Sequence, residues 1–381
     1  MIRKKYVWDL ETLRNFFSGV FKDKKTGELY KFVIHKSRND VVKLKEFLPS
    51  IDTLIGFNNV HFDAQVFQYI VNNIDEWITL ELDGEEIANR IYEIAQLVIE
   101  SEFPLYKKWE ITIPQIDLFL ILHLNNKSRR ASLKDIQISM GWYRVEDIPI
   151  HHNTNVSEEQ VESILEYNIN DVESTNELHN RCLEQISLRE RLSEKYGIDC
   201  INFNDGKIGE ELLLKFYAEK TNQNPRVVRY LRTERQFIKL KDCIPNNIKF
   251  DLRAFRDVLS YFQDKVIYHT KGAFKYEFKG SNEEIYVYGT GGIHCAAKSG
   301  IYESDEDYII KTADVQSLYP SEAVTRRLYP AHLGEEFCDI YEDEIVGVRL
   351  AEKAKPKAEQ DQTMINGYKY MANVPLTYLA A

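Results

Sequence analysis

Strand-like and helix-like segments alternate through the first half of the chain, and this alternation is the feature that most restricts its fold. Short runs of β-branched and aromatic residues are typical of strands, whereas apolar residues three and four apart are typical of one helix face. We therefore expect an α/β protein in which helices pack on a sheet. The expected strands are 6–8, 29–34 and 53–57, with a hairpin turn at 23–27, and the expected helices are 41–48, 62–71 and 157–186.

The second half of the chain carries weaker signals. A strand-rich unit is expected from Ile285, with strands at 286–288 and 308–310. After Lys353 the sequence becomes polar and irregular, which predicts frayed or incomplete structure.

Composition excludes several classes of protein. Hydrophobic residues make up 44% of the 381 residues, too many for a mainly disordered chain. No apolar run is long enough to span a bilayer, so we expect no membrane partner and a cytoplasmic location. Five scattered cysteines favour reduced thiols over a disulfide framework. The net charge of −11 argues at first against a nucleic-acid partner, because free DNA-binding domains are usually basic.

Acidic residues form a candidate metal site. Asp9 and Glu11 lie two apart at the end of an expected strand, so their side chains share one face of it. Two carboxylates on one face repel each other unless a cation lies between them. Asp63 opens an expected helix after a strand and a loop, where it can reach the carboxyl edge of the sheet. These three acids therefore predict a metal site at that edge.

A helical pair extends this constellation. Tyr167 and Asp171 are four residues apart on an expected helix and share a face, so Asp171 can hold a metal while the Tyr167 hydroxyl orients a water. The alternative is a buried tyrosine beside a structural aspartate.

These acidic runs resemble the three exonuclease motifs of the DEDD superfamily in order and spacing. The tyrosine four places before the last aspartate resembles the tyrosine subclass, and two flanking runs resemble the proofreading domains of family B DNA polymerases. The matching runs are Asp9-Leu10-Glu11, 58–63 and 167–171, and the flanking runs are Gly56-Phe57-Asn58 and Ser132-Leu133-Lys134.

The resemblance implies a ribonuclease H-like fold and a pair of Mg²⁺ or Mn²⁺ ions, which prefer hard oxygen ligands. It implies that Asp9 bridges the metals, that Glu11, Asp63 and Asp171 complete the site, and that Tyr167 positions the attacking water. Asn59 and Phe62 become candidates to contact an unpaired 3′ end, Phe62 by stacking. A loop-turn asparagine and a core phenylalanine are the alternatives for these two residues.

The run 312–321 resembles motif A of family B DNA polymerases, in which an aspartate holds the catalytic metal of the palm. The resemblance implies that Asp314 is a metal ligand, that Ser317 and Leu318 lie near an incoming triphosphate, and that Tyr319 forms the floor of the sugar pocket.

Two further runs resemble elements of the same family. The run 288–292 resembles its Tyr/Gly-Gly element, which makes Tyr288, Gly291 and Gly292 candidates to contact a template phosphate. A plain glycine-rich turn is the alternative. Lys369 opens a run that resembles the start of motif B, where a lysine grips the triphosphate.

The polymerase resemblance stops after Asn373, and no motif C or thumb sequence follows. We therefore expect no DNA synthesis by this chain alone. One chain of a split polymerase, active with a partner chain and deoxynucleotides, and a non-catalytic DNA-binding remnant are the alternatives.

The expected domains are a 3′-5′ exonuclease domain at 1–195, a connecting segment at 196–284 and a partial polymerase palm at 285–381. The expected activity is metal-dependent removal of nucleotides from 3′ ends of single-stranded or mispaired DNA, in a host cytoplasm if the source is viral. Divalent cations at the acids would invert the sign of the field where a phosphate lands, so the net charge does not exclude DNA.

Overall fold

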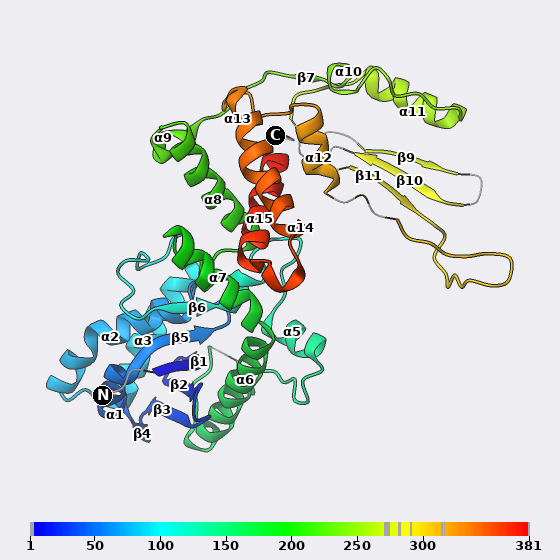
Figure 1. The fold of residues 1–381 in the computed structure, drawn as a ribbon. Coiled ribbons are helices and arrows are strands. Elements are labelled where there is room, and N and C mark those ends of the chain that lie inside the picture. The colour runs from blue at the N-terminus through cyan, green and yellow to red at the C-terminus, as the bar shows by residue number, and fades with distance from the viewer. Residues whose placement is uncertain are drawn as a thin grey trace. The chain divides into compact units, whose positions relative to one another are not determined.

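The computed structural model describes residues 4–151, 153–269, 275–280, 283–289, 292–313, 315 and 317–379. The chain divides into two units, Met1–Ile208 and Gly209–Ala381, and this division falls inside the expected connecting segment. The first unit is an α/β unit with a mixed six-stranded sheet, and small antiparallel sheets lie in the part that follows it (Figure 1).

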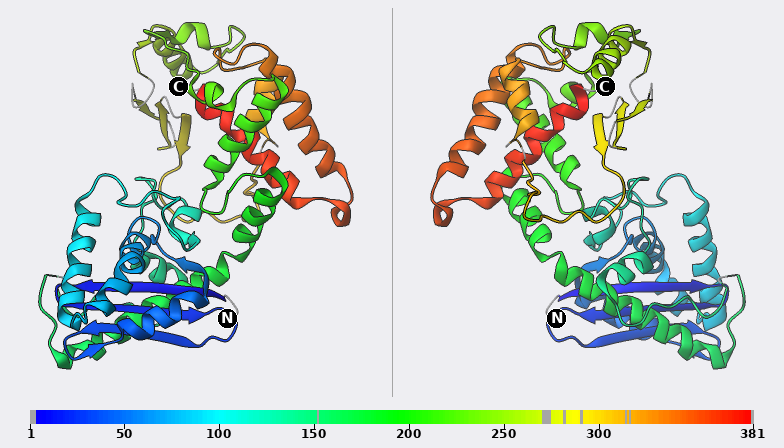
Figure 2. Two further views of the ribbon diagram at one scale, coloured as in Figure 1. Left: turned by 90° about the vertical axis from the view of Figure 1, so that its left-hand side faces the viewer. Right: turned by 90° about the vertical axis from the view of Figure 1, so that its right-hand side faces the viewer.

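The six-stranded sheet has the order β4-β3-β2-β1-β5-β6. The pairs β4-β3, β3-β2 and β2-β1 are antiparallel, whereas β5 pairs in parallel with both β1 and β6 (Figure 2). β2 was not predicted from the sequence, because its apolar run lacks the alternation of a half-buried strand. The strands are β1 Lys4–Leu13, β2 Phe16–Asp23, β3 Leu29–His35, β4 Arg38–Asn39, β5 Ile51–Gly56 and β6 Gln115–Asp117.

Helices cover both faces of this sheet. Alternate residues of β1 point to opposite faces. Tyr6, Trp8 and Leu10 pack in one core with α1, α2 and α3, and Val7 and Leu13 pack in a second core with α6. Asp9 and Glu11 have the parity of the second group and therefore face α6. The bounds are α1 Val41–Phe47, α2 Asp63–Thr79, α3 Gly84–Glu100 and α6 Val161–Arg181.

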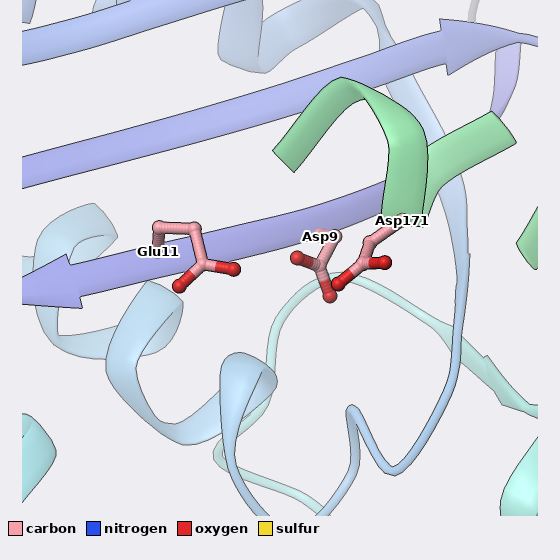
Figure 3. A group of neighbouring side chains, drawn as sticks. All are labelled: Asp9, Glu11 and Asp171. Atoms are coloured by element: carbon pink, nitrogen blue, oxygen red, sulfur yellow. The ribbon is translucent and has the colours of Figure 1, made fainter. Parts of the chain in front are cut away.

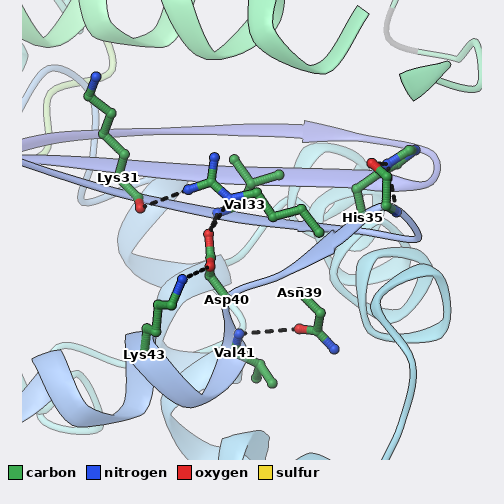
Figure 4. A network of polar contacts seen from close by, with 9 residues as sticks. Lys31, Val33, His35, Asn39, Asp40, Val41 and Lys43 are labelled. Atoms are coloured by element: carbon green, nitrogen blue, oxygen red, sulfur yellow. Dashed lines mark hydrogen bonds and ion pairs between the residues drawn. The ribbon is translucent and has the colours of Figure 1, made fainter. Parts of the chain in front are cut away.

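A buried carboxylate joins the edge of the sheet to α1. Asp40 accepts hydrogen bonds from the Val33 backbone N–H at 3.1 Å, from Arg38 Nε at 2.6 Å and from Lys43 Nζ at 2.8 Å (Figure 4). Burial alone would raise the pKa of Asp40, but these donors outweigh it and lower the pKa. The carboxylate therefore stabilises the corner as an anion.

The remaining helices of the first unit follow from local signals. The expected helix 157–186 ends at Arg181, and a second helix follows from Leu183 to Tyr196. Gly197 ends this second helix with a left-handed φ of 65°. The other elements are η1 Leu48–Ser50, α4 Leu118–Ile121, α5 Leu133–Met140, η2 Glu158–Gln160, α7 Leu183–Tyr196 and α8 Asp205–Lys220, which continues into the second unit.

The second unit contains a three-stranded sheet, β11-β10-β9, with α11 packed on it through aromatic rings. Its strands are β7 Ile238–Lys239, β8 Val266–Ile267, β9 Lys275–Lys279, β10 Ile285–Gly289 and β11 Gly292–Ala296. Its helices are α9 Pro225–Tyr230, α10 Leu240–Cys243, α11 Arg253–Gln263, α12 Leu318–Thr325, α13 Glu336–Asp339, the π-helix η3 Ile340–Gly347, α14 Val348–Ala354, η4 Lys357–Glu359 and α15 Gln362–Leu379.

Two expectations for this unit are wrong. The segment 308–310 is not a strand: Tyr308 and Ile309 are each 73% exposed, and β-branched residues form a strand only where a neighbouring strand pairs with them. The segment after Lys353 is not frayed throughout, because α15 forms and buries Ile365 and Met371. Among the described residues, no helix is both long and apolar enough to cross a membrane.

Candidate active site

Three carboxylates converge where β1 meets α6. Asp9 and Glu11 project from the same face of β1, and Asp171 projects from α6, which packs on that face. One oxygen from each residue lies within 4.8 Å of the other two (Figure 3). The spacing of two along a strand and the packing of an amphipathic helix across it produce this group.

The charges of this group oppose one another. Burial first, and then the charges of Asp63, Glu11 and Asp171, raise the pKa of Asp9 well above its usual value. Burial and the charges of Asp171 and Asp63 raise the pKa of Glu11 in the same way, and burial raises the pKa of Asp171. Partly buried carboxylates that repel one another suit a divalent cation, whose oxygen ligands are of this kind. The donor set therefore fits Mg²⁺ or Mn²⁺.

Asp63 lies at the same cleft but outside the group of three. β5 pairs with β1 only as far as Val7, and the Leu10 backbone beyond that point lies beside Asp63 and offsets part of the rise in its pKa. Its burial raises the pKa of Asp63 to about 7. All four acids expected at the site thus line one cleft of about 680 Å³.

Tyr167 lies one helical turn before Asp171 and is largely buried. Burial and the charge of Asp171 raise the pKa of Tyr167, whose hydroxyl lies beside the Asp171 carboxylate and favours its ionised form. The phenol therefore stays protonated beside the acidic group.

The loop after β5 holds Asn59 and Phe62, the two candidates for contact with a 3′ end, in different environments. Asn59 is 1% exposed, and its Nδ2 donates to Gln115 Oε1 at 2.8 Å. Gly56 permits this packing, since a Cβ there would lie 2.8 Å from the Asn59 side chain. Phe62 is half-buried and lines the cleft, as does Asn58. The structure thus places Asn59 in the support of the loop and Phe62 at the cleft.

Asp117 was not predicted as a functional residue, yet its side chain accepts hydrogen bonds from the backbone of this loop. Asp117 is fully buried, and its carboxylate accepts from the backbone N–H groups of Asn58 at 2.9 Å, Phe119 at 3.0 Å and Val60 at 3.1 Å. The signal was present: Asp117 interrupts the densest apolar run of the chain, and a buried carboxylate requires donors.

Basic and aromatic residues line the cleft together with the acids. Lys127 and Arg130 come from the segment before α5, and Phe57 and Phe119 contact each other edge to face at 5.4 Å. Lys134 pairs with Asp147, and its charge offsets part of the rise in the pKa of Glu11. The cleft therefore joins acidic oxygens, cations and aromatic rings, a combination suited to a phosphate-linked strand of bases.

The candidate residues of the second unit lie in several environments. Asp314 and Gly291 lie outside the described residues, and Gly292 begins β11. Tyr288 is 7% exposed and packs on Phe262 and Phe278, so it belongs to a small aromatic core.

The motif A and motif B candidates lie on two helices that contact each other, α12 and α15. Ser317 caps α12 with a left-handed φ of 53° and accepts a hydrogen bond from Arg349 at 3.2 Å. Leu318 and Tyr319 follow it and are exposed, and Lys369 is exposed on α15.

Comparison of the chain with protein-family models and with curated proteins found no match.

Proposed function

We propose that the first unit is a ribonuclease H-like, metal-dependent 3′-5′ exonuclease acting on DNA ends. The convergence of Asp9, Glu11 and Asp171 within 4.8 Å, with Asp63 at the same cleft, carries this proposal. Partly buried carboxylates at such separations repel one another unless a cation lies between them, and two-metal nucleases use donor sets of this type.

The substrate class follows from the other residues of the cleft. Lys127 and Arg130 supply positive charge for the phosphates of a strand, and Phe62 offers a ring on which a terminal base can stack. Duplex ends must separate before a base can reach such a ring, so single-stranded or mispaired 3′ ends are the preferred substrates.

Each residue of the site has a defined task in this proposal. Asp9, Glu11, Asp63 and Asp171 would hold two Mg²⁺ or Mn²⁺ ions. When bound, these ions supply activation of a water and charge stabilisation of the leaving 3′-oxygen. Tyr167 keeps its proton and orients the water through its hydroxyl, while Phe62 holds the terminal nucleotide in line.

The test is digestion of a 5′-labelled single strand in Mg²⁺ by the wild type and by Asp9→Asn and Asp171→Asn. We expect the rate to fall at least about 100-fold in each variant, because a lost ligand removes electrostatic stabilisation of the transition state. Glu162→Gln is the matched control, since Glu162 is an exposed acid on the same helix as Asp171. Equal digestion by the wild type and both site variants would refute the proposal.

A second candidate concerns the second unit, which we propose to contribute to a family B polymerase active with a partner chain. The contact between α12 and α15 supports it, because these helices carry Tyr319 and Lys369. Primer extension with deoxynucleotides tests it: we expect none from the chain alone, and extension by the chain alone would contradict dependence on a partner. A non-catalytic DNA-binding protein is the remaining alternative, and it requires that calorimetry detect no divalent cation binding.

A further inference from the structure

Two buried amides contact the acidic group, one from each side. Asn168 Nδ2 donates to Asp9 Oδ2 at 2.7 Å, and Gln137 Nε2 donates to Asp171 Oδ1 at 2.9 Å. Asn168 lies on α6, about one helical turn before Asp171. Gln137 lies on α5, which supplies none of the four acids. The contact of Gln137 therefore brings in a separate element.

The hydrogen bonds of Gln137 fix the orientation of its amide. Its Nε2 also donates to Ser174 Oγ at 2.8 Å, and Ser174 Oγ in turn donates to the Asp171 backbone carbonyl at 3.0 Å. Both N–H groups of the amide therefore have acceptors, and both acceptors belong to the same turn of α6. The opposite orientation would turn the amide oxygen toward the carboxylate, where two partial negative charges would repel each other.

The oxygen of the Gln137 amide accepts no hydrogen bond from the described residues. Gln137 is 1% exposed, and its Oε1 has no hydrogen-bond partner within the described part of the chain. A buried acceptor without a donor costs about 1–3 kcal/mol. A glutamine that served only to fill space would be replaced at no loss by an apolar residue of the same size, so the cost indicates a use for the N–H groups.

We propose that Gln137 is a positioning residue of the acidic centre: its amide holds the Asp171 carboxylate in the direction that metal binding requires. The hydrogen bond favours the ionised carboxylate, because an anionic oxygen accepts from the Gln137 N–H more strongly than a neutral one. Partners of this kind set the orientation of a metal ligand and change metal affinity when they are removed. The inference rests on the proposed function, since it assumes a divalent cation beside Asp171.

The local structure of α5 suits this task. The helix begins with a capping box in which Ser132 and Asp135 exchange hydrogen bonds, and Gln137 points from its buried face. Ser132 and Leu133 line the cleft at the start of the same helix. A rigid short helix thus links the cleft wall to Asp171 through one amide.

Calorimetric titration with Mn²⁺ in the absence of DNA tests the inference without any need for nuclease activity. Gln137→Met keeps the length and removes the donor, and we expect it to weaken Mn²⁺ binding about 10-fold or more. Trp142→Phe is the matched control: it removes another hydrogen bond between the α5 region and α6, from Trp142 Nε1 to Asn170 Oδ1 at 3.0 Å, and keeps the Gln137 donor to Asp171. We expect its Mn²⁺ affinity to stay within about twofold of the wild type, whereas a role in packing α5 on α6 would affect both variants alike.

Gln137→Asn provides a second variant if Gln137→Met does not fold, since it keeps an amide that is too short to reach Asp171. Steady-state digestion adds a readout specific to positioning: the Mg²⁺ concentration for half-maximal rate should rise about as much as the Mn²⁺ dissociation constant, with the KM for DNA little changed. Wild-type Mn²⁺ affinity in the folded Gln137 variants would overturn the inference and leave the proposed exonuclease intact. Weakened Mn²⁺ binding, together with a wild type that binds Mn²⁺ but digests no DNA, would support the inference and refute the exonuclease.

Discussion

At the scale of single residues, the buried carboxylate of Asp63, a candidate metal ligand, lowers the stability of the fold when it is ionised. Its burial raises the pKa of Asp63 to about 7 in the folded protein, above the 3.8 of an ordinary aspartate. The folded state therefore favours the protonated form. The resulting stabilisation is complete below about pH 4 and is lost as the pH rises through 7.

We expect Asp63→Asn to raise the free energy of unfolding at pH 8 in EDTA by about 2–4 kcal/mol and to lower DNA digestion in Mg²⁺. The asparagine oxygen can still accept from the backbone, whereas the buried charge is gone. Urea unfolding at pH 6 and pH 8 measures the effect, with Glu76→Gln as a control because Glu76 is exposed on the same helix. A variant no more stable than the wild type at pH 8 would contradict this account.

At the scale of elements, regular residue patterns predicted several strands of the sheet and α6. The other elements depend on contacts between residues that are distant in the sequence. The shared faces of Asp9, Glu11 and Asp171 could be predicted, because strand and helix periodicities depend only on nearby residues in the sequence. The segment 308–310 has strand composition but is exposed coil, and β2 escaped detection because its apolar run does not alternate. Gln137 and Asp117 also escaped, because a buried polar partner is defined by contacts distant in sequence.

The corner of β3, β4 and α1 is the element whose stability depends most clearly on one carboxylate. We expect Asp40→Ala to lower the free energy of unfolding by about 2–4 kcal/mol at pH 7, because it leaves the buried Val33 N–H and the Arg38 Nε–H without their acceptor. The surrounding donors lower the pKa of Asp40, so its contribution is present above about pH 4 and falls as the pH drops below that.

Urea unfolding at pH 7 measures this loss, and Glu46→Ala is its control, since Glu46 is an exposed acid on α1. Equal effects of the two substitutions would show that the hydrogen bonds of Asp40 add nothing to stability.

At the scale of the whole molecule, the two units should respond differently to divalent cations. The four acids of the candidate centre all belong to Met1–Ile208, and they come from β1, α2 and α6, which are separate elements of that unit. A cation bound only in the folded state stabilises it by about 2.7 kcal/mol at 100 times its dissociation constant. This free energy acts on the elements that hold the ligands, because their opening releases the cation.

Hydrogen exchange of the full chain with and without Mg²⁺ measures where that stabilisation appears. We expect slower exchange in β1, α6 and the start of α2, and no change in the helices α13 and α15 of the second unit. The difference should vanish in a variant with both Asp9→Asn and Asp171→Asn, which lacks two of the three closest carboxylates. Equal slowing in α15 and in β1 would show that the cation acts elsewhere. Slowing in β1, α2 and α6 would tie it to the acidic centre, since these elements supply its four carboxylates.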